Sequence, residues 1–220
     1  MGGKHVVVTG ASSGIGAAVC EQLEATGARI TRVTRADCDL ADPASRARWL
    51  ASFGDAHVDA LVSNAGEATY ETPSELGADR WRALFELNAF ATLDLALGLA
   101  PKMPRGAHVV AISSAAARMP PNARFAAYAA TKRALEAELD ALRLELDPRG
   151  IRVTAIAPGL VDTPLYAKVA GFGEMRDRLA RAVPQWLSPA DVAEAVVWVL
   201  ARPAHVVVTE LALLPSGQGR

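Results

Sequence analysis

The sequence contains few cysteines and few aromatic residues. There are two cysteines, Cys20 and Cys38, in 220 residues, and phenylalanine, tryptophan and tyrosine together make up 5% of the chain. The cysteines lack the spacing of metal ligands, and a disulfide is not expected, which favours reduced thiols in a cytoplasmic protein. The four histidines stand at positions 5, 57, 108 and 205 and form no cluster. The sequence therefore predicts no metal site.

The chain also lacks an excess of charge of either sign and lacks a long uncharged apolar run. Its formal net charge is -1, which gives no electrostatic attraction to nucleic acid or to an anionic membrane. No apolar stretch reaches the about 18 uncharged residues of a transmembrane helix. Residues 1–5 lead directly into a strand and leave no room for a signal peptide. We expect a cytoplasmic protein with neither nucleic acid nor membrane as a partner.

Strand-like and helix-like segments alternate along the whole chain. Strands are expected at residues 5–9, 30–34, 38–40, 58–62, 107–112, 151–156 and 206–213. Helices are expected at residues 14–25, 42–53, 78–99, 125–146 and 188–200. This alternation is typical of an α/β protein with a parallel sheet. It predicts one Rossmann-type domain over residues 1–220, with a doubly wound sheet of about seven strands and helices on both faces.

A glycine-rich segment joins the first expected strand to the first expected helix. The helix N-terminus offers free N–H groups and a positive dipole end, and glycine lets a pyrophosphate approach the backbone closely. An ordinary strand-to-helix turn is the alternative, but this position in the chain favours a dinucleotide site. The residues expected to bind the dinucleotide here are Gly10, Ser12, Ser13, Gly14, Ile15 and Gly16.

The spacing T-G-x-x-x-G-x-G over residues 9–16 resembles the fingerprint of the classical short-chain dehydrogenase/reductase family. Further family motifs follow in order: Asn64-Ala65-Gly66, Asn88, Ile112-Ser113-Ser114, Tyr128 with Lys132, and Pro158-Gly159 with Thr163. Each motif is weak alone, and their common order makes the resemblance specific. It implies that Asn88, Ser114, Tyr128 and Lys132 are catalytic. It also implies cofactor contacts from Asn64, Ala65, Gly66, Tyr128, Lys132, Pro158, Gly159 and Thr163.

Tyr128 and Lys132 are four residues apart on one expected helix, so their side chains share a face roughly 6 Å apart along the axis. A nearby ammonium, like an oxidised nicotinamide, favours the phenolate and is expected to lower the pKa of Tyr128. The phenol then acts as general acid in reduction and general base in oxidation. The resemblance implies that Lys132 also binds the nicotinamide ribose, and that Asn88 holds a water linking Lys132 to solvent. It places Ser114 where it donates to the substrate oxygen, while Ser113 stays open as the alternative.

The end of the second strand indicates which nicotinamide cofactor is preferred. Thr34 stands where NAD-preferring relatives carry Asp, and Arg35 follows it. A guanidinium suits the 2′-phosphate of NADP(H). We therefore expect NADP(H) in preference to NAD(H), with Arg35 as the main discriminator and Ser13 assisting, unless Arg35 is only a solvated loop cation. Asp39 resembles the family's acidic residue near the adenine, and the short 35–39 segment leaves no room for the usual helix before it.

Residues 160–187 form the expected substrate lid, since they combine apolar side chains with Gly171 and Gly173, which permit movement. A small, moderately hydrophobic carbonyl or alcohol is the expected substrate. The chain's end resembles the branch that includes serine and 3-hydroxy acid dehydrogenases. Two alternatives remain: a nonenzymatic NADPH-sensing or scaffold protein on the same fold, and an epimerase or dehydratase that uses the same tyrosine.

The helices at residues 89–99 and 134–146 contain more alanine and leucine than one buried face requires. Relatives pair these two helices across a two-fold axis, so we expect a homodimer or homotetramer.

Overall fold

The structure is a computed structural model that describes residues 1–119, 122–167, 169 and 171–219. Six parallel strands form one sheet in the order β2-β1-β3-β4-β5-β6. Their bounds are β1 His5–Thr9, β2 Arg29–Val33, β3 Ala60–Ser63, β4 His108–Ile112, β5 Arg152–Pro158 and β6 Glu210–Leu213. The chain runs from β1 outward to β2 and returns to β3 on the other side of β1, so a crevice opens beyond the carboxyl ends of β1 and β3.

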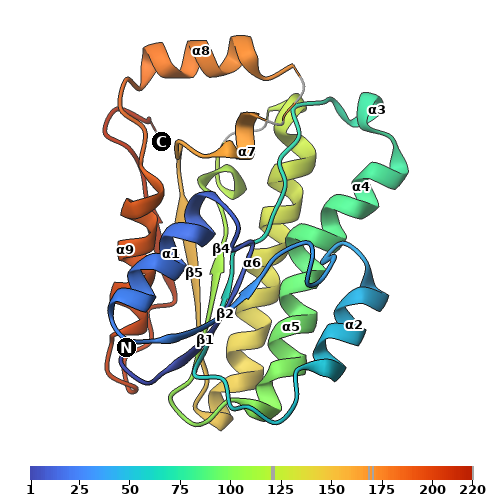
Figure 1. The fold of residues 1–220 in the computed structure, drawn as a ribbon. Helices are drawn as coiled ribbons and strands as arrows, with labels where there is room; N and C mark the ends of the chain where they lie inside the picture. The colour runs from blue at the N-terminus through green and yellow to red at the C-terminus, as the bar shows by residue number, and fades with distance from the viewer. Residues whose placement is uncertain (120–121, 168, 170, 220) are drawn as a thin grey trace.

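Helices cover both faces of the sheet (Figure 1). On one face, α1 Gly14–Ala25 packs along α9 Pro189–Leu200. The other face is covered by α2 Pro43–Ser52, α5 Ala91–Leu99 and α6 Ala126–Leu146. The π-helix Glu86–Phe90 links α5 to α4 Ala78–Phe85, which packs against α6. The short helices α3 Pro73–Leu76, α7 Pro164–Ala167 and α8 Gly173–Ala182 lie toward the carboxyl ends of the strands. The α/β Rossmann-type fold predicted from the sequence is confirmed.

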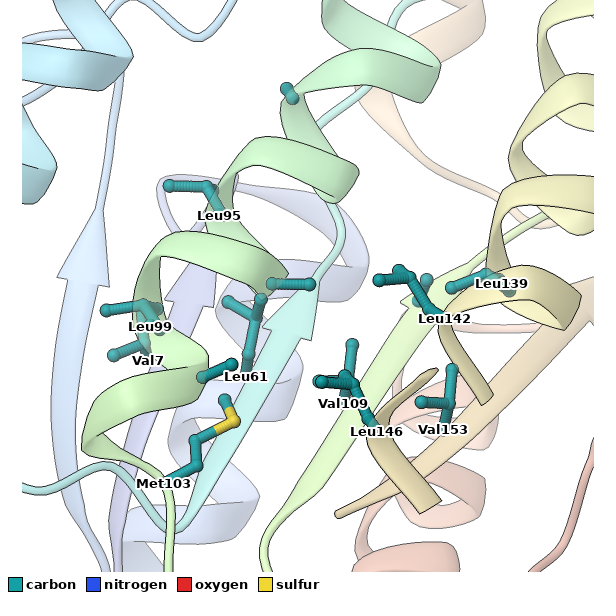
Figure 2. Packing of buried hydrophobic residues seen from close by; sticks show 14 of the residues in the cluster. Val7, Leu61, Leu95, Leu99, Met103, Val109, Leu139, Leu142, Leu146 and Val153 are labelled. Carbon is teal, nitrogen blue, oxygen red and sulfur yellow. The ribbon is translucent and has the colours of Figure 1, made fainter. Parts of the chain in front are cut away.

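Alternate residues of the strands feed two separate hydrophobic cores. In β1, Val6 and Val8 face α1 and α9, while Val7 points to the opposite face. Figure 2 shows that opposite core, where strand residues pack against leucines of α5 and α6. The labelled strand residues are Val7, Leu61, Val109 and Val153, and the labelled leucines are Leu95, Leu99, Leu139, Leu142 and Leu146. Burial on both faces explains why these strands read as continuous β-branched runs.

The segment 38–40 is not a strand, so the sheet has six strands where the sequence predicted about seven. Its backbone groups are used elsewhere. The Cys38 N–H donates to Thr34 O (3.0 Å) within a turn, and the Leu40 carbonyl accepts from the Arg46 guanidinium (2.7 Å). With these groups occupied, the segment does not join a ladder, although Cys38 and Leu40 are buried. Cys38 and Cys20 are both free thiols.

The last strand is also shorter than the predicted 206–213. Three carbonyls before β6 accept hydrogen bonds from side chains of β5 and α6. Arg152 donates to Val206 O, Thr154 to Val208 O, and Arg143 to Thr209 O. The other predicted elements are present, with ends that differ from the predicted ones by no more than two residues.

The sequence predicts no transmembrane helix, yet one helical stretch meets the length and hydropathy of a membrane span. It covers Ala78–Lys102, with a mean hydropathy of 1.4 in its most apolar window, half of which is buried. Leu95 and Leu99 of this stretch lie fully buried against the sheet. A buried core helix passes the same test, so the stretch is weak evidence for a membrane.

Arg46 of α2 connects three separate segments. Its guanidinium donates to Asp94 of α5 (2.8 Å), to Glu86 of the π-helix (2.8 Å) and to the Leu40 carbonyl (2.7 Å). The Arg46 side chain is 3% exposed. A buried cation needs such partners, and each partner would lose its bond without the cation.

We predict that Arg46→Ala lowers the free energy of unfolding by about 2 kcal/mol, because it leaves the carbonyl of the buried Leu40 without its donor and removes the ion pairs with the partly exposed Glu86 and Asp94. Arg48→Ala is the matched control on the same helix, since the Arg48 side chain is 72% exposed; its effect should stay within about 0.5 kcal/mol. Urea unfolding measures both. Equal effects of the two substitutions would contradict a structural role of the Arg46 network.

Candidate active site

A cavity of about 390 Å³ lies at the carboxyl ends of the strands. The glycine-rich loop and the ends of β2 and β3 form one part of its wall. The ends of β4 and β5, α6 and the segment after β5 form the rest. The cavity brings together nearly all the residues that the sequence predicted for the site. Those lining it are Gly10, Ser12, Ser13, Gly14, Ile15, Arg35, Asp39, Asn64, Ala65, Gly66, Ser114, Tyr128, Lys132, Pro158, Gly159 and Thr163. Gly16 and Asn88 lie behind the wall.

The glycine loop requires glycine at specific positions. Gly14 has φ +55°, a left-handed conformation that side chains disfavour. A Cβ on Gly16 would lie 2.2 Å from the Gly10 carbonyl oxygen, so only glycine lets the helix begin this close to the strand. Ser13 is the N-cap of α1, and among the described residues no side chain caps this N-terminus and no acidic residue occupies its first turn. The end of α1 therefore suits an anion.

Asn64 holds the loop against the end of β3. Its side-chain amide donates to the carbonyls of Thr9 (3.1 Å) and Gly10 (3.3 Å). In return, the Thr9 hydroxyl accepts from the N–H groups of Asn64 (2.9 Å) and Ala65 (3.0 Å). The carboxyl ends of β1 and β3 are thus joined by four hydrogen bonds. Asn64 lines the cavity, but its side-chain amide is already used by the backbone, so its role in the structure is to shape the loop.

Tyr128 and Lys132 lie on one face of α6, as the sequence predicted. Both are buried, and the Lys132 ammonium lies 6.0 Å from the centroid of the Tyr128 ring. The ammonium donates to the Ile112 carbonyl at the end of β4 (2.8 Å). Burial lowers the pKa of Lys132 to about 8, and the charge of Glu136 opposes that decrease.

The expected decrease in the pKa of Tyr128 is not found in the structure. Burial raises the pKa of the phenol above its ordinary value, and a hydrogen bond with Ser114 offsets the increase only in part. The physical reason is that the phenol is buried, while Lys132 points its ammonium at the Ile112 carbonyl.

The two candidate serines differ in their partners. Ser113 donates its hydroxyl to Glu136 of α6 (2.7 Å). Ser114 accepts from the Ala116 N–H (3.1 Å) and shares a hydrogen bond with the Tyr128 phenol. The backbone is extended at Ser114, with φ -162° and ψ 148°, so neighbouring side chains point to opposite sides. Of the two, Ser114 has its hydroxyl beside the tyrosine.

Asn88 lies in the π-helix Glu86–Phe90. Its Oδ1 accepts from the Glu67 N–H (2.8 Å), and its Nδ2 donates to the Glu67 carbonyl (2.8 Å) and the Thr131 hydroxyl (3.0 Å). A Cβ on Gly66 would lie 3.2 Å from Asn88 Oδ1 and 3.6 Å from Lys132 Nζ, so Gly66 separates the two side chains. Both amide protons of Asn88 are used, and its water-holding role stays a prediction.

The other end of the cavity carries the cationic Arg35. Arg35 is exposed at the end of β2 and lines the cavity. The one acidic residue in the same turn, Asp37, accepts from the N–H and hydroxyl of Thr34 (2.9 and 2.7 Å), and these bonds lower its pKa. Asp37 does not line the cavity. At this end of the cavity, Asp39 is therefore the acidic residue that shares the wall with Arg35.

Several further lining residues were not predicted as site residues. Glu67, Ala68 and Leu87 are among them. Each is close in sequence to a predicted residue, Gly66 or Asn88, and this adjacency is the signal that could have found them. Gln218, near the chain's end, accepts from the Leu160 N–H (2.9 Å) beside Gly159. Among the described residues, no three His, Cys, Asp or Glu side chains are grouped to hold a metal ion.

The segment after β5 begins and ends at one place. Val161 and Leu187 form a β-bridge, supported by hydrogen bonds from Asp162 N to Leu187 O (2.8 Å) and from Leu187 N to Leu160 O (3.0 Å). Between these ends, the Tyr166 ring stacks on Phe172 at 4.8 Å and meets the Trp186 ring at 6.1 Å. Tyr166 also lines the cavity, and burial raises its pKa.

Two family models match the chain. One is described as enoyl-(acyl carrier protein) reductase and matches residues 31–214, and the other is described as short chain dehydrogenase and matches residues 4–48. Among curated proteins, the chain is 34% identical over 224 residues to the cyclic-di-GMP-binding biofilm dispersal mediator protein of Escherichia coli K12. That alignment covers 94% of this chain and 93% of the relative. It is 30% identical over 234 residues to an uncharacterized oxidoreductase of Staphylococcus epidermidis, with 96% and 97% covered.

Solved structures show the same similarity in three dimensions. The structure of BdcA in complex with NADPH has a TM-score of 0.86 and 29% identity, and covers 99% of this chain and 95% of that chain. The closed form of serine dehydrogenase complexed with NADP+ has a TM-score of 0.85 and 27% identity, with 98% and 96% covered. Each similarity thus extends over nearly the whole of both chains.

Proposed function

The chain belongs to the short-chain dehydrogenase/reductase family of oxidoreductases, and on that premise we propose that it transfers a hydride between NADP(H) and a small carbonyl or alcohol substrate. The observation that carries the proposal is a single cavity with Ser114, Tyr128 and Lys132 at one end and Arg35 at the other. A proton donor and a phosphate-binding cation are thus held at the two ends of one site.

The residues present fit a nicotinamide dinucleotide phosphate. The uncapped N-terminus of α1 suits the pyrophosphate. Arg35 would hold the 2′-phosphate, with Ser13 assisting, and Asp39 would lie near the adenine. Asn64, Ala65, Gly66, Pro158, Gly159 and Thr163 would contact the remainder of the cofactor. Similar chains have been crystallised with NADPH and with NADP+, which supports the same preference here.

The chain's own residues handle the proton. When bound, the nicotinamide supplies or accepts the hydride. Tyr128 gives its phenolic proton to the developing alkoxide in reduction and takes it back in oxidation. The Lys132 ammonium, with a pKa of about 8, is positively charged at neutral pH. At 6.0 Å from the centroid of the Tyr128 ring, its charge would favour the phenolate that forms when the proton leaves, without offsetting the effect of burial on the resting phenol. Ser114 donates a hydrogen bond to the substrate oxygen and orients it toward Tyr128.

Residues 160–187 act as the substrate lid in this proposal. The β-bridge between Val161 and Leu187 ties the two ends of the lid together. Ala68, Leu87, Leu165 and Tyr166 give the substrate end of the cavity an apolar wall. This lining favours a moderately hydrophobic carbonyl or alcohol. We place the whole of residues 1–220, including the lid, in one cytoplasmic domain.

A second candidate function is ligand sensing without turnover. It is favoured by the similarity to a biofilm dispersal mediator protein named for binding cyclic-di-GMP. The presence of Asn88, Ser114, Tyr128 and Lys132 together argues for catalysis, because a sensor needs no buried proton donor beside a lysine. An epimerase or dehydratase that uses Tyr128 would show no net consumption of NADPH.

We predict that the chain oxidises NADPH with members of a panel of aldehydes, ketones, diketones and 3-oxo acids, followed by absorbance. Tyr128→Phe should lower kcat about 100-fold or more, because it removes the proton donor. Ser114→Ala should lower kcat about 100-fold as well, and the matched Ser113→Ala should lose much less, since Ser113 points to Glu136. NADPH binding without turnover by any panel member would favour the sensor.

We predict that Arg35→Ala weakens NADPH binding about 10- to 100-fold, because a charge-assisted bond to the phosphate is lost. NADH binding should change little. Arg32→Ala is the control, since Arg32 lies on β2, shortly before Arg35, but pairs with Glu24 (2.9 Å) and does not line the cavity. Fluorescence titration of each variant with both cofactors measures the effect. An unchanged ratio of the two affinities would make Arg35 a solvated loop cation.

Two helices carry apolar stripes that face outward. On α6, Ala137, Ala141 and Leu144 are exposed at helical spacing, and Leu144 is 81% exposed. At α5, Phe90 and Leu97 are exposed large hydrophobic residues. Two such stripes side by side form a surface that a second copy of the chain would bury. This supports a homodimer, or a homotetramer built from it.

We predict that Leu144→Glu shifts the chain to a monomer in sedimentation equilibrium, because a carboxylate would be buried in the interface. Leu214→Glu is the matched control, because Leu214 is also an exposed leucine but lies near the C-terminus, outside the two helices. Wild-type chain that sediments as a monomer at micromolar concentration would contradict the oligomer.

A further inference from the structure

Glu136 lies one helical turn beyond Lys132 on α6 and does not line the cavity. Its side chain is 18% exposed. One carboxylate oxygen accepts from the Ser113 hydroxyl at 2.7 Å and from Arg118 Nη2 at 3.0 Å. The other accepts from Arg118 Nε at 3.3 Å. The carboxylate is therefore held on two sides, by the end of β4 and by the turn that follows it.

Arg118 extends this connection to the edge of the sheet. Its guanidinium also forms an ion pair with Glu210 of β6. Glu136 thus belongs to a network that joins α6, the segment after β4 and β6. A network of charged hydrogen bonds across three elements restrains each of them more strongly than one exposed ion pair does.

Three consecutive residues at the end of β4 each interact with α6. The Ile112 carbonyl accepts from Lys132, the Ser113 hydroxyl donates to Glu136, and Ser114 shares a hydrogen bond with Tyr128. The three α6 residues are spaced by four, so they form one stripe along the helix. Two members of the stripe are the proton donor and the lysine of the proposed reaction, and the third is Glu136.

We propose that Glu136 is a positioning residue, whose carboxylate fixes the Ser113–Ser114 segment against α6 so that Ser114 and Lys132 keep their places beside Tyr128. The inference rests on the proposed function and adds to it a residue outside the cavity. Glu136 does not touch the substrate. It acts through Ser113, its neighbour Ser114, and the negative charge that it holds near the Lys132 ammonium.

The charged surroundings of both groups bear on any pH dependence. Glu136 faces Arg118 from the segment after β4 and Glu210 from β6, and Asp140 with Arg143 follow on its own helix around a small cavity of about 200 Å³. Lys132 faces Tyr128 and Glu136 on its own helix and the uncharged Ile112 carbonyl and Asn88 from other elements. Glu136 is thus the carboxylate that supports the charge of Lys132.

Two variants separate position from charge. Glu136→Gln keeps an acceptor for Ser113 and removes the charge, whereas Glu136→Ala removes both. Asp140→Asn is the matched control, one turn further along α6, where the carboxylate is 74% exposed and pairs with Arg143. The affinity for NADPH, measured by fluorescence titration, should stay near that of the wild type in all three and shows that each variant is folded.

We expect Glu136→Ala to lower kcat about tenfold with little change in KM, because the serine loses its position. Glu136→Gln should restore most of kcat at pH 6.5. As the pH is raised, the kcat of Glu136→Gln should begin to decline about half a pH unit below the pH at which the wild type declines. The reason is that the pKa of Lys132 is lower without the carboxylate, so Lys132 loses its proton at a lower pH. Asp140→Asn should match the wild type throughout. A wild-type kcat in Glu136→Ala would overturn the proposal.

A second measurement does not depend on turnover. The chain has four lysines, so carbon NMR of the lysine Cε positions can follow Lys132, assigned by its loss in Lys132→Met. In both Glu136 variants the pKa of Lys132 should fall below its wild-type value, while Asp140→Asn leaves it unchanged. If the wild type reduces no substrate, the proposed function fails, and this titration still decides the inference. An unchanged Lys132 titration in both variants would overturn it.

Discussion

The central strands carry valine, leucine and isoleucine on both faces, so neither face of the sheet can be left to water. Val6 and Val8 need α1 and α9, and Val7, Leu61 and Val109 need α5 and α6. Parallel strands linked by helical crossovers place helices on both faces. All carboxyl ends then lie at one edge, where the chain reverses its order between β1 and β3. The place of the cavity follows from the burial of the sheet.

At that edge, hydrogen bonds from polar side chains to the backbone hold neighbouring segments together, as strand pairing does within the sheet. Thr9 and Asn64 join the ends of β1 and β3 through backbone groups, and Asn88 fixes the Glu67 peptide from the π-helix. Arg46 connects the π-helix to the Leu40 carbonyl near the Arg35 end of the cavity. Thr9, Arg46 and Asn88 are buried, Asn64 is partly buried, and all four are paired, so removal of one partner would leave the other unsatisfied. The site is therefore held by hydrogen-bonded side chains in its wall, such as Asn64, and directly behind it, such as Thr9, Arg46 and Asn88.

The relation between α6 and β4 decides which groups are available for chemistry. Tyr128, Lys132 and Glu136 meet three consecutive residues at the end of β4, and this contact leaves Ser114, rather than Ser113, beside the phenol. The same contact explains the titration behaviour. Burial raises the pKa of Tyr128 and lowers that of Lys132 to about 8, because both charged forms lose solvation. The charge of Glu136 on the same helix opposes the decrease in the pKa of Lys132 but does not cancel it.

The sequence alone determined the alternation of strands and helices, the glycine loop at the first βα junction and the order of the motifs that bear the site. These depend on local patterns: β-branched runs, helical spacing, and glycine where φ is positive or the backbone approaches closely. The unformed strand at 38–40, the shortened last strand, the partner of each serine and the direction of the Tyr128 pKa were decided by tertiary structure. The deciding groups come from other elements of the fold, and Arg46, although only six residues from Leu40, is itself positioned by the distant Glu86 and Asp94. Arg46 binds the Leu40 carbonyl, Arg152 and Thr154 bind carbonyls before β6, and Glu136 binds the Ser113 hydroxyl. A local pattern cannot reveal such partners, because burial and long-range hydrogen bonds exist only once the chain has folded.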